Sequence, residues 1–174
     1  MKSFLVCCAC SLTISSALSA QAVYDELPAG FIGTTDKVYD QYLLPRSTNQ
    51  PVHIQYCYDL AEIANSGSPA ILELAWRRNN FYTNAVPAGS VTMTVEMGHS
   101  TNLPSAMSTK FANNIAIGKV QVFQGTMNYP AAVKGNGPAP WTHVLKIVKP
   151  VVFNVQKGTN KSLTIDMIIT ATTG

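Results

Sequence analysis

The chain has 174 residues, of which 47% are hydrophobic and 12% are charged, and its formal net charge is +3. The lysines that make up the basic excess are scattered along the chain, and Arg77-Arg78 is the one adjacent basic pair. Nucleic-acid binding needs basic residues gathered on one face. The composition therefore predicts no DNA or RNA partner, and it does not indicate binding to acidic lipids.

Residues 1–22 have the three parts of a cleavable secretory signal peptide. Lys2 gives a charged tip, an apolar stretch runs from Phe4 to about Leu18, and Ala20-Gln21-Ala22 places small residues at the cleavage site. We expect the mature chain to begin at Val23 and to be secreted, or held in the periplasm or at the cell surface. An uncleaved anchor is the alternative, but a spanning helix needs about 20 apolar residues, and hydroxyl side chains thin this stretch.

Cleavage would remove three of the four cysteines and leave Cys57 alone in the mature chain. No disulfide within the mature chain is then expected. Unpaired cysteine is among the most buried side chains, so we expect Cys57 to pack as a small hydrophobe rather than to serve as a reactive thiol. No apolar run after residue 22 approaches the length of a membrane span, so no second anchor is predicted.

Residues 23–50 carry proline and glycine without sustained periodicity, and we expect an irregular segment or an edge strand there. Residues 51–174 instead contain short runs in which apolar and polar residues alternate, most clearly from Val91 to Met97, as in half-buried strands. The runs are residues 52–58, 71–78, 91–97, 119–124, 143–149, 151–155 and 163–171. Glycine and proline turn signals separate them. This pattern predicts an all-β domain, a jelly-roll-like antiparallel β-sandwich of about seven or eight strands.

One or two short helical turns are expected between these strands. Asp59, with Glu62 three residues later, has the spacing of a capping box. A second turn is expected after Asn102, because Pro104 suits a first helical position. The apolar residues that recur there at helical spacing are Leu103, Met107 and Phe111. Helices this short would plug or cap a sandwich rather than form a layer.

Several segments occur in an order that is moderately specific. The first three are an arginine-bearing strand (71–78), a strand ending at Gly98-His99-Ser100 (91–100) and a Thr-x-Phe-Ala-x-Asn segment (109–114). They are followed by a proline before a Phe-containing strand (150–153), a glycine turn (157–158) and a Leu-x-x-Asp-x strand (163–167). Over about residues 50 to 168 the chain resembles a group of uncharacterised secreted bacterial β-sandwich proteins that has no assigned activity.

Members of that group often continue beyond the Asp-containing strand, sometimes to a C-terminal sorting segment, whereas this sequence stops at Gly174. The resemblance therefore implies either a short member or a truncated one. It also leaves the closure of the sandwich open, because a terminal apolar strand at residues 163–171 that lacked its neighbour would expose an unpaired edge.

The sequence contains residue types that serve in hydrolases, but no motif joins them. Triad candidates are Ser100, the histidines His53, His99 and His143, and the acids Asp59 and Asp166. Gly98-His99-Ser100 lacks the Gly-x-Ser-x-Gly elbow that exposes a nucleophilic serine. Glycosidases need two carboxylates about 5 to 10 Å apart, and Glu73 with Asp166 is the least implausible pair. We expect a protein without catalytic machinery.

The residues that could bind a metal ion are also too far apart in the expected strand. His53 and Cys57 would share one face of a strand, but four residues of strand separate them by about 13 Å. No Asp-x-Asp-x-Asp run marks a calcium loop. We therefore predict neither a metal nor another cofactor.

Four aromatic residues fall in expected loops and form the candidate binding site, since exposed rings on a β-sandwich can stack on sugars. They are Phe81, Tyr82, Tyr129 and Trp141. Trp141 could equally plug the edge of the sandwich, and Trp76, which shares a face with Leu72 and Leu74, is expected in the core. The sequence thus predicts an exported non-catalytic module that binds a partner or has a structural role at the surface. The alternative is a carbohydrate-binding domain or an accessory domain of a carbohydrate-active enzyme, with a polysaccharide or cell-surface component as partner.

Overall fold

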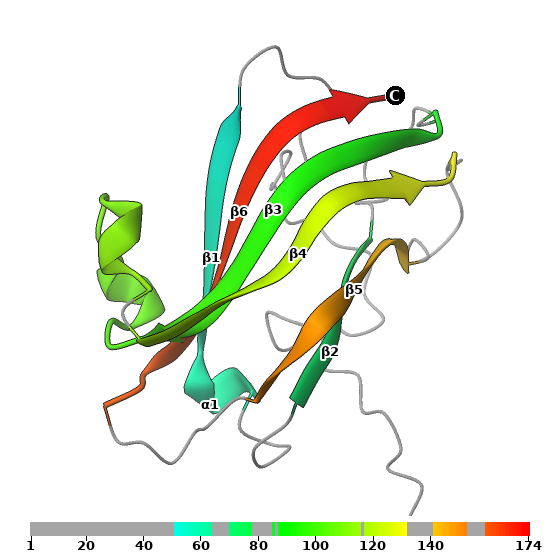
Figure 1. The fold of residues 1–174 in the computed structure, drawn as a ribbon. Helices are drawn as coiled ribbons and strands as arrows, with labels where there is room; N and C mark the ends of the chain where they lie inside the picture. Colours follow the sequence, from blue (N-terminus) through cyan, green and yellow to red (C-terminus); the bar gives the residue numbers. More distant parts are fainter. Residues whose placement is uncertain are drawn as a thin grey trace, which may run out of the picture.

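The computed structural model describes residues 51–63, 70–77, 85, 87–115, 117–131, 141–152 and 159–174. Its strands are β1 (Val52–Asp59), β2 (Ala70–Arg77), β3 (Gly89–Ser100), β4 (Ile117–Tyr129), β5 (Trp141–Val152) and β6 (Ser162–Thr173) (Figure 1). The helical elements are α1 (Leu60–Ile63) and the 3-10 turns η2 (Pro104–Ala106) and η3 (Phe111–Asn113). The predicted signal peptide and the segment 23–50 lie outside the described residues. No helix among those described is long and apolar enough to span a membrane.

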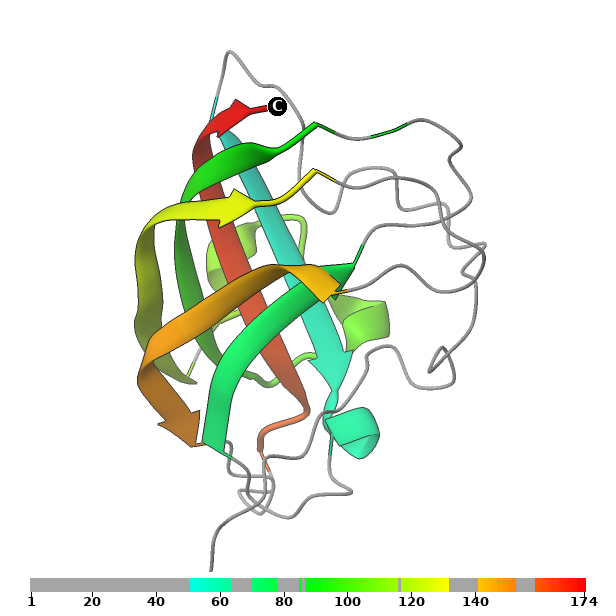
Figure 2. The same ribbon diagram turned by 90° about the vertical axis from the view of Figure 1, so that its right-hand side faces the viewer.

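The strands form two antiparallel sheets, which confirms the all-β prediction. One sheet has four strands in the order β1-β6-β3-β4, and the other pairs β2 with β5. The small sheet crosses one face of the large sheet, and β5 lies next to β4 (Figure 2). The described part of the chain contains six strands rather than the seven or eight expected.

The predicted strands at 143–149 and 151–155 lie in one strand, β5, as far as Val152, where the described part of it ends. Pro150 lies inside β5, where the register against β2 shifts: Ile71 pairs with Val151, but Glu73 pairs with Lys146. Proline has no N–H to donate and is accepted where the ladder is irregular. The proline therefore marks a bulge and not the boundary between two strands.

The core lies between the two sheets. Val91, Met93, Val95 and Met97 on β3 are at most 1% exposed, as the alternation predicted. They share one cluster with Trp76 of β2 and with residues of β5, which are Leu145, Ile147 and Val151. Trp76 is thus in the core as expected. The prediction that Leu72 shares its face is wrong, since the register shift after Ile71 leaves Leu72 56% exposed.

The apolar strand at residues 163–171 is paired along both edges. β6 is bonded to β1 along one edge and to β3 along the other, so it is an interior strand of the large sheet. Ile165, Met167 and Ile169 of this strand are buried. Both neighbours of this strand are segments that precede it by many residues.

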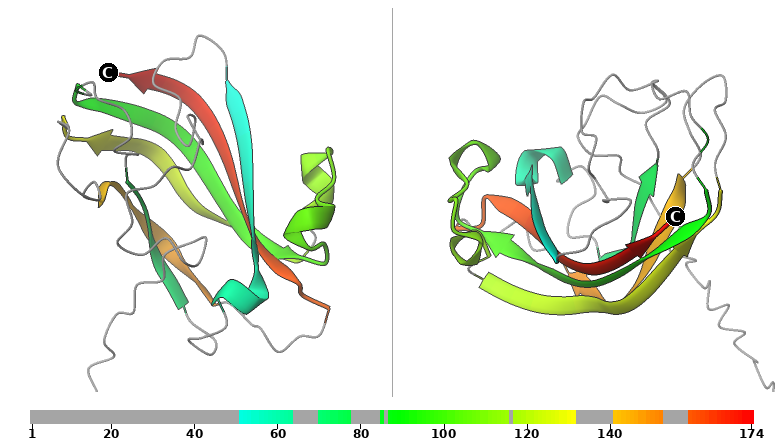
Figure 3. Two further views of the ribbon diagram at one scale, coloured as in Figure 1. Left: turned by 180° about the vertical axis from the view of Figure 1, so that it is seen from behind. Right: turned by 90° about the horizontal axis from the view of Figure 1, so that it is seen from above.

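Both expected helical turns form, the second in altered shape. Asp59 Oδ1 accepts a hydrogen bond from the backbone N–H of Ala61 at 2.9 Å and caps α1. Pro104 starts η2, but Met107 is extended (φ −61°, ψ 137°), and a separate turn follows at η3. The two 3-10 turns do not plug the sandwich. They lie beside β1, on the side of the large sheet away from β2 and β5 (Figure 3).

Candidate functional site on the outer face of the four-stranded sheet

The face of the large sheet that points away from β2 and β5, called the outer face below, is polar. Alternation along β3 sends its buried apolar residues to the core, so the residues between them point outward. Strand register extends this set to the neighbouring strands. On β3, β4 and β6 the in-register outer residues are Thr92, Thr126 and Ala171; Thr94, Gln124 and Ile168; and Glu96, Gln121 and Asp166. β1 adds His53, Gln55 and Cys57, whose partners on β6 are Ile168, Asp166 and Thr164.

A row of four ionisable side chains crosses this face from strand to strand. His53 Nε2 on β1 lies 2.5 Å from Asp166 Oδ1 on β6 and is hydrogen-bonded to it. Glu96 on β3 forms an ion pair with Lys119 on β4. Asp166 and Glu96 are in-register neighbours, an arrangement that is unfavourable for like charges. Each carboxylate in the charged row therefore has a partner on its other side, which is His53 for Asp166 and Lys119 for Glu96.

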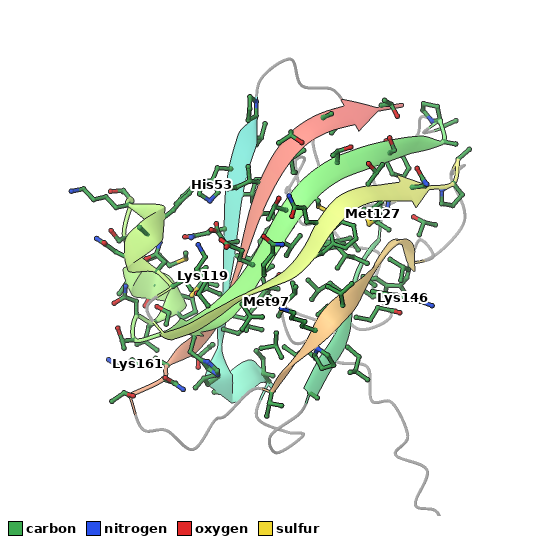
Figure 4. The ribbon with its side chains drawn as sticks, viewed as in Figure 1. His53, Met97, Lys119, Met127, Lys146 and Lys161 are labelled. Carbon is green, nitrogen blue, oxygen red and sulfur yellow. The ribbon has the colours of Figure 1, made fainter. Side chains whose placement is uncertain are left out.

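Exposure differs along the charged row. The side chain of Asp166 is 7% exposed and that of Glu96 is 24% exposed, whereas His53 and Lys119 are 39% and 49% exposed. Figure 4 shows His53 on β1 and Lys119 near the start of β4. A ligand on the outer face would therefore meet the histidine, the lysine and one edge of Glu96 before it reached Asp166.

Residues 101–115, called the clasp below, cover one end of the outer face. Asn114 is fully buried. Its side chain links the clasp to β1 and also links two parts of the clasp to each other. Its Nδ2 donates to Gln55 Oε1 at 2.9 Å and to the Ser108 carbonyl at 2.8 Å, and its Oδ1 accepts from the Ser108 N–H at 2.8 Å. Gln55 Nε2 in turn donates to the Phe111 carbonyl at 3.0 Å.

Hydroxyl groups of β6, the strand next to β1, also hydrogen-bond to the clasp. Thr164 Oγ1 donates to the Asn114 carbonyl at 2.9 Å, and Ser162 Oγ donates to the Asn102 carbonyl at 2.7 Å. Cys57 lies in this polar layer, and its thiol donates to Ser162 Oγ at 3.1 Å. The prediction that Cys57 packs as a small hydrophobe is therefore wrong, because it is half-buried among hydroxyls on the outer face and not in the core.

The clasp also orients the histidine of the charged row. The ring of Phe111 meets the His53 ring edge to face, with centroids 4.3 Å apart and an interplanar angle of 82°. Asp166 holds the Nε2 side of the same ring. His53 is thus fixed by one contact from the sheet and one from the clasp, which makes it a defined part of the surface and not a freely rotating side chain.

The rest of the outer face is open and carries amides and hydroxyls. A register shift between Val95 and Glu96 adds a residue to β4, so Gln121 and Gln124 both face outward although they are three residues apart. Gln121 Nε2 donates to Gln124 Oε1 at 3.2 Å. The hydroxyls of Thr92 and Thr126 are bonded to each other at 2.9 Å. This open part, with Glu96 at its border, is a surface of hydrogen-bonding groups fixed on strands.

The structure does not gather the four aromatic residues into a loop cluster. Phe81 and Tyr82 lie outside the described residues. Tyr129 is in β4 and not in a loop, is 6% exposed, and donates its hydroxyl proton to the Thr173 carbonyl at 2.9 Å. Its ring also stacks on His143, so its face is not open to a sugar. Trp141 begins β5 and is 46% exposed, which leaves it as the accessible member among those described.

The triad candidates remain apart, except for one pair. His99 and Ser100 are consecutive in β3 and point to opposite faces, and Ser100 Oγ accepts the N–H of Asn102 at 3.0 Å. His53 and Asp166 do meet, but Ser100 pairs with Ser162, four residues along β6 from Asp166, or about 13 Å away. The described residues therefore hold a histidine–carboxylate pair without a serine beside it.

The carboxylate pair chosen from the sequence is not brought together. Glu73 is exposed on β2, opposite Lys146 of β5, whereas Asp166 is buried on β6 of the other sheet. Glu96 is the carboxylate that faces Asp166. Within the described ranges no group of three or more His, Cys, Asp or Glu side chains could hold a metal ion.

Sequence reasoning missed the charged row because its members lie in four separate strands. One signal was available: Asp166 interrupts the apolar run Ile165 to Ile169 at an outward position. A carboxylate placed there needs a partner, which the sequence does not name. Comparison of the chain with protein-family models, curated proteins and solved structures finds no match.

Burial lowers the pKa of His143, beside Tyr129, below its usual value of about 6.5. In the folded protein this ring stays neutral to a lower pH than in the unfolded chain, where it binds a proton as the pH falls below about 6.5. We therefore expect the free energy of unfolding to decrease between neutral pH and pH about 5. Urea denaturation at several pH values would measure the decrease. His143→Gln should make it smaller, and an unchanged pH slope in this variant would contradict the assignment.

Proposed function

We propose that the protein is an exported, non-catalytic binding module and that its ligand occupies the open part of the outer face. The observation that carries this proposal is the set of polar groups fixed on neighbouring strands: Glu96, Gln121, Gln124 and the paired threonines. Binding groups held on strands are positioned better than groups on loops. Export is supported by the signal-peptide pattern of residues 1–22.

The ligand class that fits this surface is a polysaccharide or a glycosylated component of the cell surface. Carboxylate oxygens accept hydrogen bonds, and side-chain amides both donate and accept them, which matches the hydroxyl groups of a sugar. A row of such groups along neighbouring strands suits an extended polymer. Among the described residues no serine lies beside the His53–Asp166 pair, which favours a binding role over triad chemistry.

The proposal includes a bacterial origin and a jelly-roll-like arrangement of the two sheets. The bacterial origin follows from the resemblance to secreted bacterial proteins, and the jelly-roll-like arrangement follows from the alternating strands. The position of the small sheet across one face of the large sheet is compatible with such a sandwich. The alternative binding site is the surface around Trp141, where an exposed indole could stack on a sugar ring.

A glycan array probed with the mature chain tests the proposal. We expect binding by the wild type, and a loss of at least about tenfold when Gln121 and Gln124 are both replaced by alanine, equal to about 1.4 kcal/mol. Glu73→Gln, an exposed change on the other sheet, is the matched control and should bind as the wild type does.

Two results would contradict the proposal in different ways. No binding of the wild type to any glycan would refute a polysaccharide ligand. Loss of binding in Trp141→Ala, with the double glutamine variant unaffected, would move the site from the outer face to the start of β5.

A further inference from the structure

The small sheet exposes apolar side chains on the face that points away from the core, called the ribbon face below. An antiparallel sheet with one face on the core usually presents polar residues on the other. Here Leu72 is 56% exposed, Val144 37%, Val148 73% and Val152 64%. Large apolar side chains grouped on one surface mark an interaction site more often than scattered ones do.

The same face carries a pair of opposite charges, and Lys149 of β5 is exposed next to Val148 as well. Glu73 on β2 and Lys146 on β5 are in-register partners, and both are exposed. Figure 4 shows Lys146 extending from β5 away from the four-stranded sheet. Val144, the in-register partner of Ala75, is two residues from Lys146 along β5. The charged pair therefore lies between apolar neighbours on the ribbon face.

A two-fold axis brings the same patch of two copies together, so that residue i meets residue j and j meets i. A patch with an acid next to a base is self-complementary under this operation. Glu73 of each copy can face Lys146 of the other, while the valines and Leu72 of the two copies bury one another. The charge pattern thus fits a second copy of this chain as the partner.

We propose that the ribbon face packs against the ribbon face of a second copy to form a two-fold dimer. β2 has eight residues, a length of about 26 Å, and the face is two strands wide. This size is below that of a standard specific interface, so the dimer is weak and forms at micromolar concentration or above. The outer face lies on the opposite side of each copy. The dimer therefore leaves both ligand surfaces open, and it does not depend on the proposed ligand.

Sedimentation velocity of the mature chain, from about 1 μM to about 1 mM and without glycan, tests the dimer. We expect the mean mass to rise from that of one chain toward that of two. Val148→Lys should keep the protein monomeric over the whole range. Gln124→Lys, which adds the same charge on the outer face, is the control and should dimerise as the wild type does. A wild type that stays monomeric at all concentrations would refute the proposal, as would unchanged dimerisation of Val148→Lys.

A charge-exchange experiment identifies the contact. Glu73→Lys and Lys146→Glu each place like charges across the two-fold axis, and each should weaken dimerisation at least about tenfold. An equimolar mixture of the two variants restores opposite charges at both contacts and should dimerise close to the wild type. Glu73 and Lys146 are also neighbours within one chain, but mixing cannot repair an effect inside a chain. A mixture as monomeric as its components would therefore refute the proposed packing.

Discussion

Replacing Asn114 with alanine is expected to lower the free energy of unfolding by about 2 to 4 kcal/mol, because it leaves buried or half-buried hydrogen-bonding groups without partners. The side chain is fully buried and makes three hydrogen bonds, two with the backbone of Ser108 and one with Gln55 on β1. Alanine can replace none of them. Urea denaturation followed by tryptophan fluorescence would measure the change.

Asn113→Ala is the matched control for this prediction. Asn113 is the adjacent residue, is exposed, and its side chain donates a long hydrogen bond of 3.4 Å to Ser108 Oγ. Its loss should cost no more than about 0.5 kcal/mol. If Asn113→Ala and Asn114→Ala had equal stability, the clasp would not be held by the Asn114 contacts. Faster proteolysis of residues 101–115 in Asn114→Ala alone would locate the effect in the clasp.

Much of the fold could be predicted from the sequence because alternation reports which side of a strand is buried. Val91 to Met97 gave β3 and its core face, and Asp59 gave the cap of α1. These features depend on residues close in the chain. Two predictions were wrong where the strand pairing is irregular. Pro150 was taken to separate two strands, and Leu72 was assigned to the core. Both errors come from the register shift between β2 and β5, which no single strand reveals.

The candidate site depends on pairings between distant segments, and these could not be predicted. His53 and Asp166 are separated by 113 residues, and Glu96 faces Asp166 only because β6 lies between β1 and β3. The sequence left the neighbours of β6 open. Cys57 was expected to pack as a small hydrophobe because unpaired cysteine is usually buried. Its thiol lies among hydroxyls because β1 presents that face to the clasp.

The largest effect of a single truncation in the core is expected at Met97. This residue is fully buried on the inner face of β3, between Ile165 of β6 and Val120 of β4, its in-register partners. Met97 is labelled in Figure 4 near the centre of the large sheet. Met97→Ala removes most of a side chain that is enclosed by two strands and by the small sheet. The cavity and the lost burial should lower the free energy of unfolding by about 3 kcal/mol.

Two further variants separate packing from chemistry at this position. Met97→Leu nearly conserves the volume, so it should cost less than about 1.5 kcal/mol. Met107→Ala removes the same groups from the half-buried clasp, where neighbours and water can fill the space, and should cost less than Met97→Ala. Denaturant midpoints at constant slope would measure all three. Equal losses for the two alanine variants would mean that the space between the sheets is not the main source of stability, and that the clasp contributes as much as the core.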